Sequence, residues 1–161
     1  KPILGYNYGA KNKDLIIKAE KQLLIFALIF TSSFFALSFV IAKPFAIMFI
    51  GIGKETINYE IVNEASKIIF YYMIGIIPLS FQYIFVDGLT GLGQARYSIW
   101  LSLFRKVGIF IPCLFLLPLI SNNVESCFYA EPISDVISAI ISSTFYLIFL
   151  PKILKKIETK K

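Results

Sequence analysis

The sequence predicts an all-α protein that crosses a membrane with four helices. Hydrophobic residues make up 57% of the 161 residues and charged residues only 16%, whereas a soluble domain has about 45–50% and about 25%. The apolar residues form four continuous runs, each close to the roughly 20 residues that a helix needs to cross a bilayer. None of the runs alternates between apolar and polar residues, which excludes membrane β-strands. A polytopic membrane helix bundle is therefore the predicted fold class.

The predicted spans follow one another along the chain with short connections. The first has no charged residue, the second contains Asp87, the third contains Arg105 and Lys106, and the fourth contains Asp135. The spans are predicted at residues 23–42, 68–92, 97–120 and 132–150. Amphipathic stretches are predicted before the first and second spans, at residues 14–21 and 55–67, and the latter is expected at the membrane interface.

The positions of the basic residues predict the orientation of the spans. Of the 16 Lys and Arg residues, Arg105 and Lys106 lie inside a span, eleven lie in the two ends and the 91–96 loop, and three lie on the other side. Positive loops stay in the cytoplasm. Residues 1–22 are therefore predicted as a cytoplasmic loop and residues 151–161 as a cytoplasmic tail. The three residues on the other side are Lys43, Lys54 and Lys67.

Polar residues at membrane depth are the candidate functional residues, because they are costly there and usually face a bundle interior. In the last span such residues recur every three or four positions and share one helix face. They are Glu131, Asp135, Ser138, Ser142 and Tyr146. The candidates for an ion or substrate pathway are Tyr71, Gln82, Asp87, Arg105, Glu131 and Asp135. Several of these residues also have a structural alternative to a functional role. The serines could join helices, Glu131 could cap its helix, and Tyr71 could be an interfacial anchor.

Two charge pairings are predicted. Glu131 and Asp135 lie one helical turn apart and could hold a proton or a cation between them. Asp87 lies nine residues before Arg96 and Arg105 nine residues after it, so antiparallel helices would bring Asp87 and Arg105 to equal depth. In the alternative, Arg105 extends to lipid phosphates, and Lys106 is the stronger candidate for that role.

Several classes of function are excluded or disfavoured by the composition. The chain has no His, which excludes catalytic triads and histidine-ligated metals. Cys113 and Cys127 form no CxxC motif, so no metal site or cofactor is expected. The net charge of +6 is dispersed among apolar runs, which argues against nucleic acid as a partner. An intramembrane enzyme would need a nucleophile and a base at membrane depth. The chain has no His, and its close pair of carboxylates, Glu131 and Asp135, lies near the predicted outer surface. No enzymatic activity is therefore expected.

Three segments resemble the multidrug and toxic compound extrusion (MATE) transporters. The opening PILGYNYGAKNKD is similar to the family pattern QPIIGYNYGAKN, with Gly5, Tyr6, Asn7 and Gly9 in the predicted cytoplasmic loop. FQYIFVDGLTGLGQARYSIWLSLFRK resembles the family's connection between helices ten and eleven, and FYAEPISD resembles the start of helix twelve. The three segments occur in the family's order and cover most of the chain.

The resemblance implies that the chain holds the end of helix eight and helices nine to twelve. MATE proteins are twelve-helix antiporters made of two six-helix lobes, and they export drugs or organic cations in exchange for H⁺ or Na⁺ by alternating access. The expected partners are the lipid bilayer, the missing N-terminal helices and cationic or amphipathic drugs. The expected location is the cell membrane, as a multi-pass protein with both termini in the cytoplasm.

The chain also departs from the family pattern. The family's cation-linked acids on helices one and seven fall outside it, and Asp87 lies nearer the cytoplasmic end than the family's acid on helix ten. That role is therefore not assigned to Asp87. The alternatives are a lipid-linked oligosaccharide flippase of the same superfamily, for which Arg105 and Lys106 would have to bind a pyrophosphate, and a membrane assembly protein that transports nothing.

Overall fold

The described part of the chain is helical throughout. A computed structural model describes residues 1–52 and 58–158, and these residues contain no β-strand. The elements in chain order are α1 (Pro2–Gly9), α2 (Lys13–Gly51), α3 (Tyr59–Ile74), α4 (Ile76–Gly91), α5 (Ala95–Leu103), the π-helix η1 (Phe104–Phe110), α6 (Ile111–Ser121), the 3₁₀-helix η2 (Val124–Tyr129) and α7 (Ala130–Glu158). The predicted all-α fold class is confirmed.

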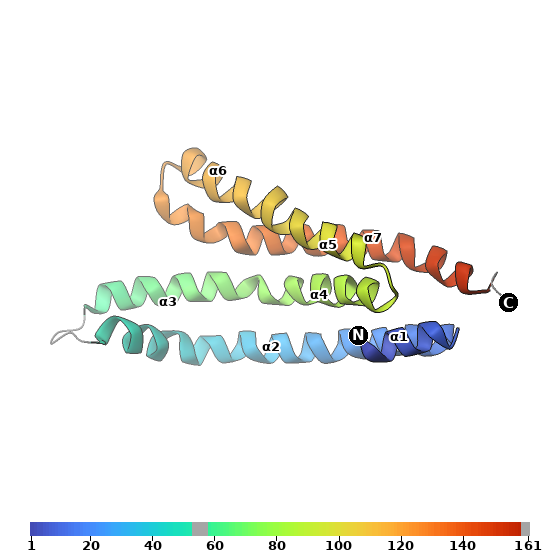
Figure 1. Ribbon diagram of the computed structural model, residues 1–161. Helices are drawn as coiled ribbons and strands as arrows, with labels where there is room; N and C mark the ends of the chain where they lie inside the picture. Colours follow the sequence, from blue (N-terminus) through green and yellow to red (C-terminus); the bar gives the residue numbers. More distant parts are fainter. Residues whose placement is uncertain (53–57, 159–161) are drawn as a thin grey trace.

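Apart from α1, these elements form four long rods (Figure 1). The rods are Lys13–Gly51, Tyr59–Gly91, Ala95–Ser121 and Val124–Lys155, and each is long and apolar enough to cross a membrane. α2 lies beside α3 and α4, while the rod of α5, η1 and α6 crosses α7 obliquely. The predicted number of four membrane-spanning helices is thus confirmed, and the chain is a multi-pass membrane protein.

The helix bounds differ from the predicted spans mainly at the first rod. α2 continues through Pro44 to Gly51 instead of ending near residue 42. Most of the predicted loop at residues 1–22 is helical, because it forms α1 and the start of α2. The amphipathic stretch at 55–67 begins outside the described residues and continues from Tyr59 as α3. Lys54, Lys160 and Lys161 also lie outside the described residues.

Local sequence signals explain where several helices begin and turn. Asn12 caps α2, with its side-chain oxygen accepting from the Leu15 amide at 3.3 Å. Asn58 caps α3 by accepting from the Glu60 amide at 3.0 Å. Asparagine is among the preferred N-cap residues, because its side chain satisfies amides that the helix leaves unpaired. The turn between α4 and α5 uses Gly93 at a φ of 74°, which favours glycine.

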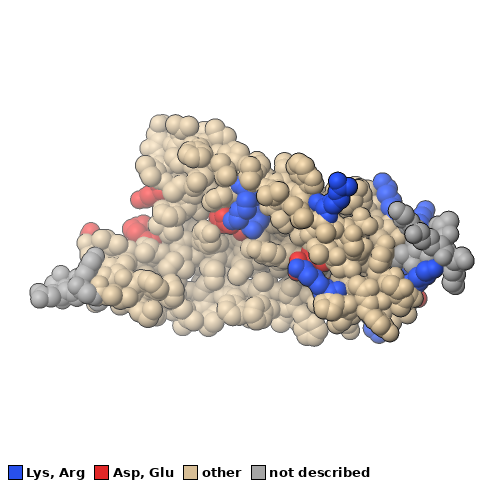
Figure 2. All heavy atoms as spheres, in the orientation of Figure 1, with Lys and Arg blue, Asp and Glu red and all other residues tan. Residues whose placement is uncertain are grey.

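The buried core lies at the end of the bundle where α1, α2, α4 and α7 meet. Its members are Leu4, Ile16, Leu89, Leu92, Tyr146, Ile153 and Leu154. Many large apolar side chains point outward instead, with Phe26, Trp100 and Leu119 between 69% and 73% exposed. An apolar outer surface of this kind fits a lipid environment. Figure 2 shows one such face, which is largely uncharged. Acidic residues lie toward the left end and beside basic residues in the middle, and further basic residues lie toward the right.

The turns are segregated between the two ends of the bundle. The turn between α1 and α2, the turn at residues 92–94 and the end of α7 lie toward one end in Figure 1. The end of α2, the start of α3 and residues 122–123 lie toward the other end. This arrangement is the one that the predicted topology requires. Which end faces the cytoplasm stays a prediction.

Candidate functional site

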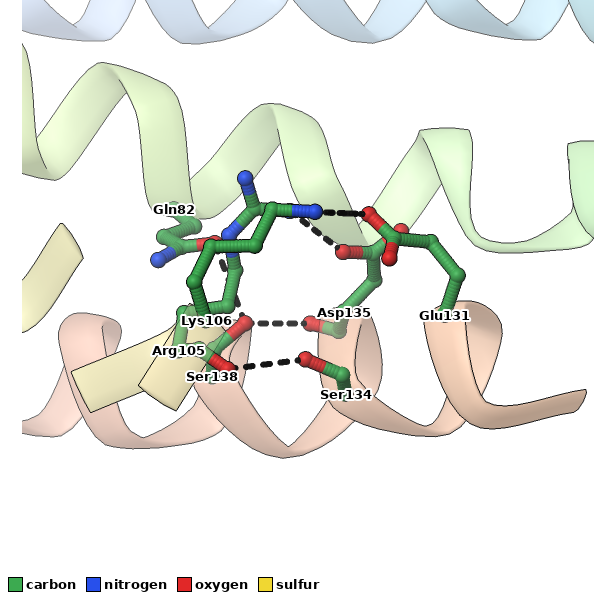
Figure 3. A network of polar contacts seen from close by, with 7 residues as sticks. All are labelled: Gln82, Arg105, Lys106, Glu131, Ser134, Asp135 and Ser138. Atoms are coloured by element: carbon green, nitrogen blue, oxygen red, sulfur yellow. Dashed lines mark hydrogen bonds and ion pairs between the residues drawn. The ribbon is translucent and has the colours of Figure 1, made fainter. Parts of the chain in front are cut away.

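Four charged side chains from η1 and α7 meet inside the bundle (Figure 3). We call Arg105, Lys106, Glu131 and Asp135 the α7 charge cluster. Arg105 Nη1 lies 2.8 Å from Asp135 Oδ1 and 3.6 Å from Glu131 Oε1. Lys106 Nζ lies 2.6 Å from Glu131 Oε1. The cluster therefore links two adjacent basic residues to two acids one helical turn apart.

The cluster is largely shielded and its formal charges balance. The side chains of Arg105, Glu131 and Asp135 are 10%, 10% and 4% exposed, and that of Lys106 is 46% exposed. A single unpaired charge at membrane depth costs about 2.5–3.5 kcal/mol on insertion scales. Two cations facing two anions offset much of that cost, and removing one partner leaves another charge stranded.

The basic half of the cluster lies in the π-helix η1. Both Arg105 and Lys106 belong to η1, and consecutive side chains diverge less around the wider turn of a π-helix. Ser134 Oγ donates to the Arg105 carbonyl oxygen at 3.3 Å, which ties the π-helix backbone to α7. The Arg105 guanidinium lies 5.7 Å from the centre of the Tyr83 ring. π-Helical segments occur frequently at functional sites.

The acidic half of the cluster lies in the first turns of α7. Negative side chains are favoured near a helix N-terminus by the helix dipole, and Pro132 is tolerated in the first turn because no amide hydrogen bond is lost there. The predicted polar face is buried: Asp135, Ser138, Ser142 and Tyr146 are 1–3% exposed. The sequence periodicity therefore identified the inward face of α7.

Gln82 joins the cluster from α4. The Ser138 hydroxyl lies 3.0 Å from Gln82 Oε1 and 3.1 Å from the Asp135 carbonyl oxygen, so it can donate to either. Gln82 is 3% exposed. Of the predicted pathway residues, Gln82, Arg105, Glu131 and Asp135 are thus brought together.

Asp87 lies elsewhere, and the predicted Asp87–Arg105 pair is wrong. Asp87 Oδ1 bonds Lys1 Nζ at 2.9 Å, with both side chains about half exposed. α4 meets α5 through another face, where Ser98 Oγ donates to the Val86 carbonyl oxygen at 2.9 Å. Asp87 is one residue further on, roughly 100° around the helix. The Asp87 side chain faces Lys1, at the start of α1, and the Arg105 guanidinium lies beside Tyr83, one turn earlier in α4.

The remaining predicted site residues lie outside the cluster. The Tyr71 ring is 5.5 Å from the Tyr129 ring and the residue is 41% exposed. The motif with Gly5, Tyr6, Asn7 and Gly9 forms α1 rather than a loop. Asn7 Nδ2 donates to the carbonyl oxygen of Ile3 at 2.9 Å, so this side chain bonds within its own helix.

The motif's glycines differ in their surroundings, and Tyr6 points outward. A Cβ on Gly5 would lie 3.4 Å from the Gly91 carbonyl oxygen, so α1 packs closely on the end of α4. Nothing lies within 4 Å of a Cβ on Gly9, and Tyr6 is 78% exposed.

Sequence reasoning missed two polar residues that bond at the α7 charge cluster and one buried acid elsewhere. Lys106 was assigned to the lipid interface but bonds Glu131, and Ser134 was not singled out. Glu20 lay in the predicted loop, yet it is 6% exposed. Its place three or four residues from Ile16 and Leu23 on one helix face was the available signal. Among the described residues, no group of three acidic or cysteine side chains could hold a metal ion.

The chain is similar to a known protein family. The MatE family model matches residues 1–116, which is well over half of the chain. The chain belongs to the MatE family. The match ends before α7, so the carboxylates of the α7 charge cluster come from outside the matched segment.

A solved structure shares the fold of this MatE chain. It is described as the inward-facing conformation of a multidrug resistance MATE family transporter of the MOP superfamily, and the TM-score is 0.86 at 15% sequence identity. The similarity covers 95% of this chain and 34% of that transporter, so the chain spans about a third of its length. None of the curated proteins compared with the chain matches it.

Proposed function

We propose that this chain is part of a secondary active multidrug efflux antiporter. It contributes four helices to one lobe of a twelve-helix transporter that exports organic cations or drugs in exchange for H⁺ or Na⁺. The observation that supports this most directly is membership of the MatE family across residues 1–116. The shared fold with a multidrug resistance transporter adds to it. The proposed activity is transport rather than catalysis, and it needs the helices of both lobes.

The pairing of the basic residues favours a drug transporter over a lipid-linked oligosaccharide flippase. A pyrophosphate substrate would need cationic side chains available in the cavity. Arg105 and Lys106 are the basic residues inside the spans predicted from the sequence, and both are bonded to carboxylates of the α7 charge cluster. The cluster therefore offers a phosphate no unpaired cation.

The α7 charge cluster is our candidate for a conformational switch of this transporter. A proton or Na⁺ that binds Glu131 or Asp135 would compete with Lys106 or Arg105 for the same oxygen. Such competition would weaken the connection between η1 and α7, two elements joined by these bonds. Alternating access by rigid-body movement of helix bundles needs contacts of this breakable kind.

The proposal places the chain in the cell membrane with both termini in the cytoplasm. The excess of basic residues at the ends and in the 91–96 loop supports this orientation. The buried acids of α7 then lie nearer the outer side.

The test uses the complete reading frame that encodes this chain, in cells that lack their main efflux pumps. We expect expression to accelerate ethidium efflux and to raise the tolerated ethidium concentration at least fourfold. Dissipating the proton gradient or the sodium gradient separately then identifies the coupling ion. Unchanged efflux despite verified membrane insertion would reject the proposed function.

A further inference from the structure

A second buried acid lies away from the α7 charge cluster, where α2, α4 and α7 meet. Glu20 of α2 is 6% exposed and Tyr146 of α7 is 1% exposed. Glu20 Oε1 and Tyr146 Oη are both buried, and neither has a hydrogen-bond partner among the described residues. Buried polar atoms are nearly always paired, so these two atoms require an explanation.

The two oxygens converge on one glycine of α4. A Cβ on Gly88 would lie 2.7 Å from Glu20 Oε1 and 3.3 Å from Tyr146 Oη. Only a residue without a side chain leaves this space free. The arrangement therefore brings a carboxyl and a phenol from different helices to a shared point over the α4 backbone.

The charged groups around Glu20 do not neutralise it. Glu20 borders a groove of about 450 Å³ whose lining also includes Lys1, Tyr83 and Asp87. The Lys1 ammonium bonds Asp87 at 2.9 Å, so the cation of the groove already has an anion. On the other side the surroundings are apolar, and the Phe85 ring stacks on the Tyr146 ring at 4.8 Å.

We propose that Glu20 and Tyr146 form a proton-binding site that joins α2 to α4 and α7. An ionised carboxylate buried without a cation is strongly disfavoured, whereas the neutral carboxyl is tolerated when its hydroxyl is hydrogen-bonded. Protonated Glu20 can donate to Tyr146 Oη after a small side-chain rotation. Hard metal cations take several oxygen ligands, and two oxygens in an apolar core do not supply them.

The groove provides the path for the proton. Water entering the groove can deliver a proton to Glu20 and receive it back, with the carboxylate left ionised. The ionised side chain must then turn toward the water of the groove. Because Glu20 is held against Gly88 and Tyr146, this movement loosens the packing of α2 on α4 and α7. The site is independent of the proposed transport function.

Infrared difference spectroscopy between acidic and alkaline pH tests the site, with the full-length protein in lipid nanodiscs. We expect the carbonyl band of protonated Glu20 to disappear at alkaline pH. Glu20→Gln should remove this band, and Glu60→Gln, at an exposed position of α3, should retain it. Tyr146→Phe keeps the ring and should shift the band by removing the partner of the carboxyl.

The variants keep the test decisive even where one of them folds poorly. If the spectra of the wild type and Glu20→Gln are identical, or if Tyr146→Phe leaves the band unmoved, the site is rejected. Loss of the band on adding Na⁺ at constant pH would also overturn the proposal, because it identifies a sodium site. In a matched pair, Gly88→Ala should abolish or shift the band and Gly9→Ala should leave it unchanged, since only the first position faces Glu20.

Discussion

Arg105 in the π-helix η1 bonds Asp135 in α7 across 2.8 Å, and both side chains are at most 10% exposed. Thirty residues separate them in the sequence. This bond, rather than the predicted bond to Asp87, is one of several that connect the crossing rod of α5, η1 and α6 to α7 and α4.

A double-mutant cycle should show that Arg105 and Asp135 stabilise each other. Arg105→Gln and Asp135→Asn are each expected to destabilise the folded full-length protein by about 3–5 kcal/mol, because each leaves a buried charge unpaired. The double variant should lose clearly less than the sum. Unfolding in mild detergent measures the three values, and strict additivity would reject the pair.

The Lys1–Asp87 pair is the matched control for that cycle. Its side chains are 54% and 50% exposed, so solvent screens the interaction. Asp87→Asn is expected to change the free energy of unfolding by about 0–1 kcal/mol. A decrease in the free energy of unfolding as large as that caused by Asp135→Asn would mean that the solvent exposure of the side chains does not decide the strength of these ion pairs.

Gly75→Ala should disturb the contact between the α3–α4 rod and the start of α7. A Cβ there would lie 2.8 Å from Asp135 Oδ2 and 3.0 Å from Pro132 Cα. Overpacking of this kind typically costs about 1–3 kcal/mol. Gly9→Ala has open space around it and should be close to neutral. Thermal unfolding of the two variants side by side checks the difference, and equal midpoints would contradict this contact.

Cysteine labelling from outside intact cells should reveal the orientation. Cys113 and Cys127 are first replaced, and single cysteines are introduced at Asn58 or Arg96, which are both exposed. A membrane-impermeant maleimide is expected to label the Asn58 position and to spare the Arg96 position until the cells are opened. The reverse pattern would show that the charge asymmetry misassigns the cytoplasmic side.

Transport should depend on Asp135 if the α7 charge cluster is the proposed switch. In the complete transporter, Asp135→Asn is expected to reduce ethidium efflux at least tenfold and to alter its pH dependence. Asp87→Asn should leave both close to wild type. Unchanged efflux and an unchanged pH profile in Asp135→Asn would remove the cluster from the coupling mechanism.

Residues 1–161 by themselves should not transport. Four helices cannot enclose the cavity that two lobes form in the proposed transporter, and the chain spans 34% of the matched MATE transporter. Liposomes containing only this chain are therefore expected to show no dye accumulation against a gradient. Gradient-driven accumulation would contradict the proposal that transport needs the helices of both lobes.

Sequence reasoning was strongest for features that depend only on the order of residues along the chain. Span number followed from apolar run length, and the inward face of α7 followed from the spacing of Asp135, Ser138 and Tyr146, which are all buried. Helix bounds were less well predicted. α2 continues through Pro44 to Gly51, because Lys43 and Pro44 interrupt the apolar run without ending the helix.

The sequence by itself determined that this chain is a four-span helical membrane protein of the MatE family, since hydropathy, periodicity and motif order are properties of the linear chain. Only the tertiary structure decided which charges meet. Asp87 and Arg105 have matching distances from Arg96, but the rotation of α4 turns Asp87 toward Lys1, and the crossing of η1 over α7 brings Arg105 to Asp135. The spacing of residues along one helix can be counted from sequence, whereas the depth at which two helices meet, the rotation of a helix and the partner it crosses depend on the packing of all the helices together.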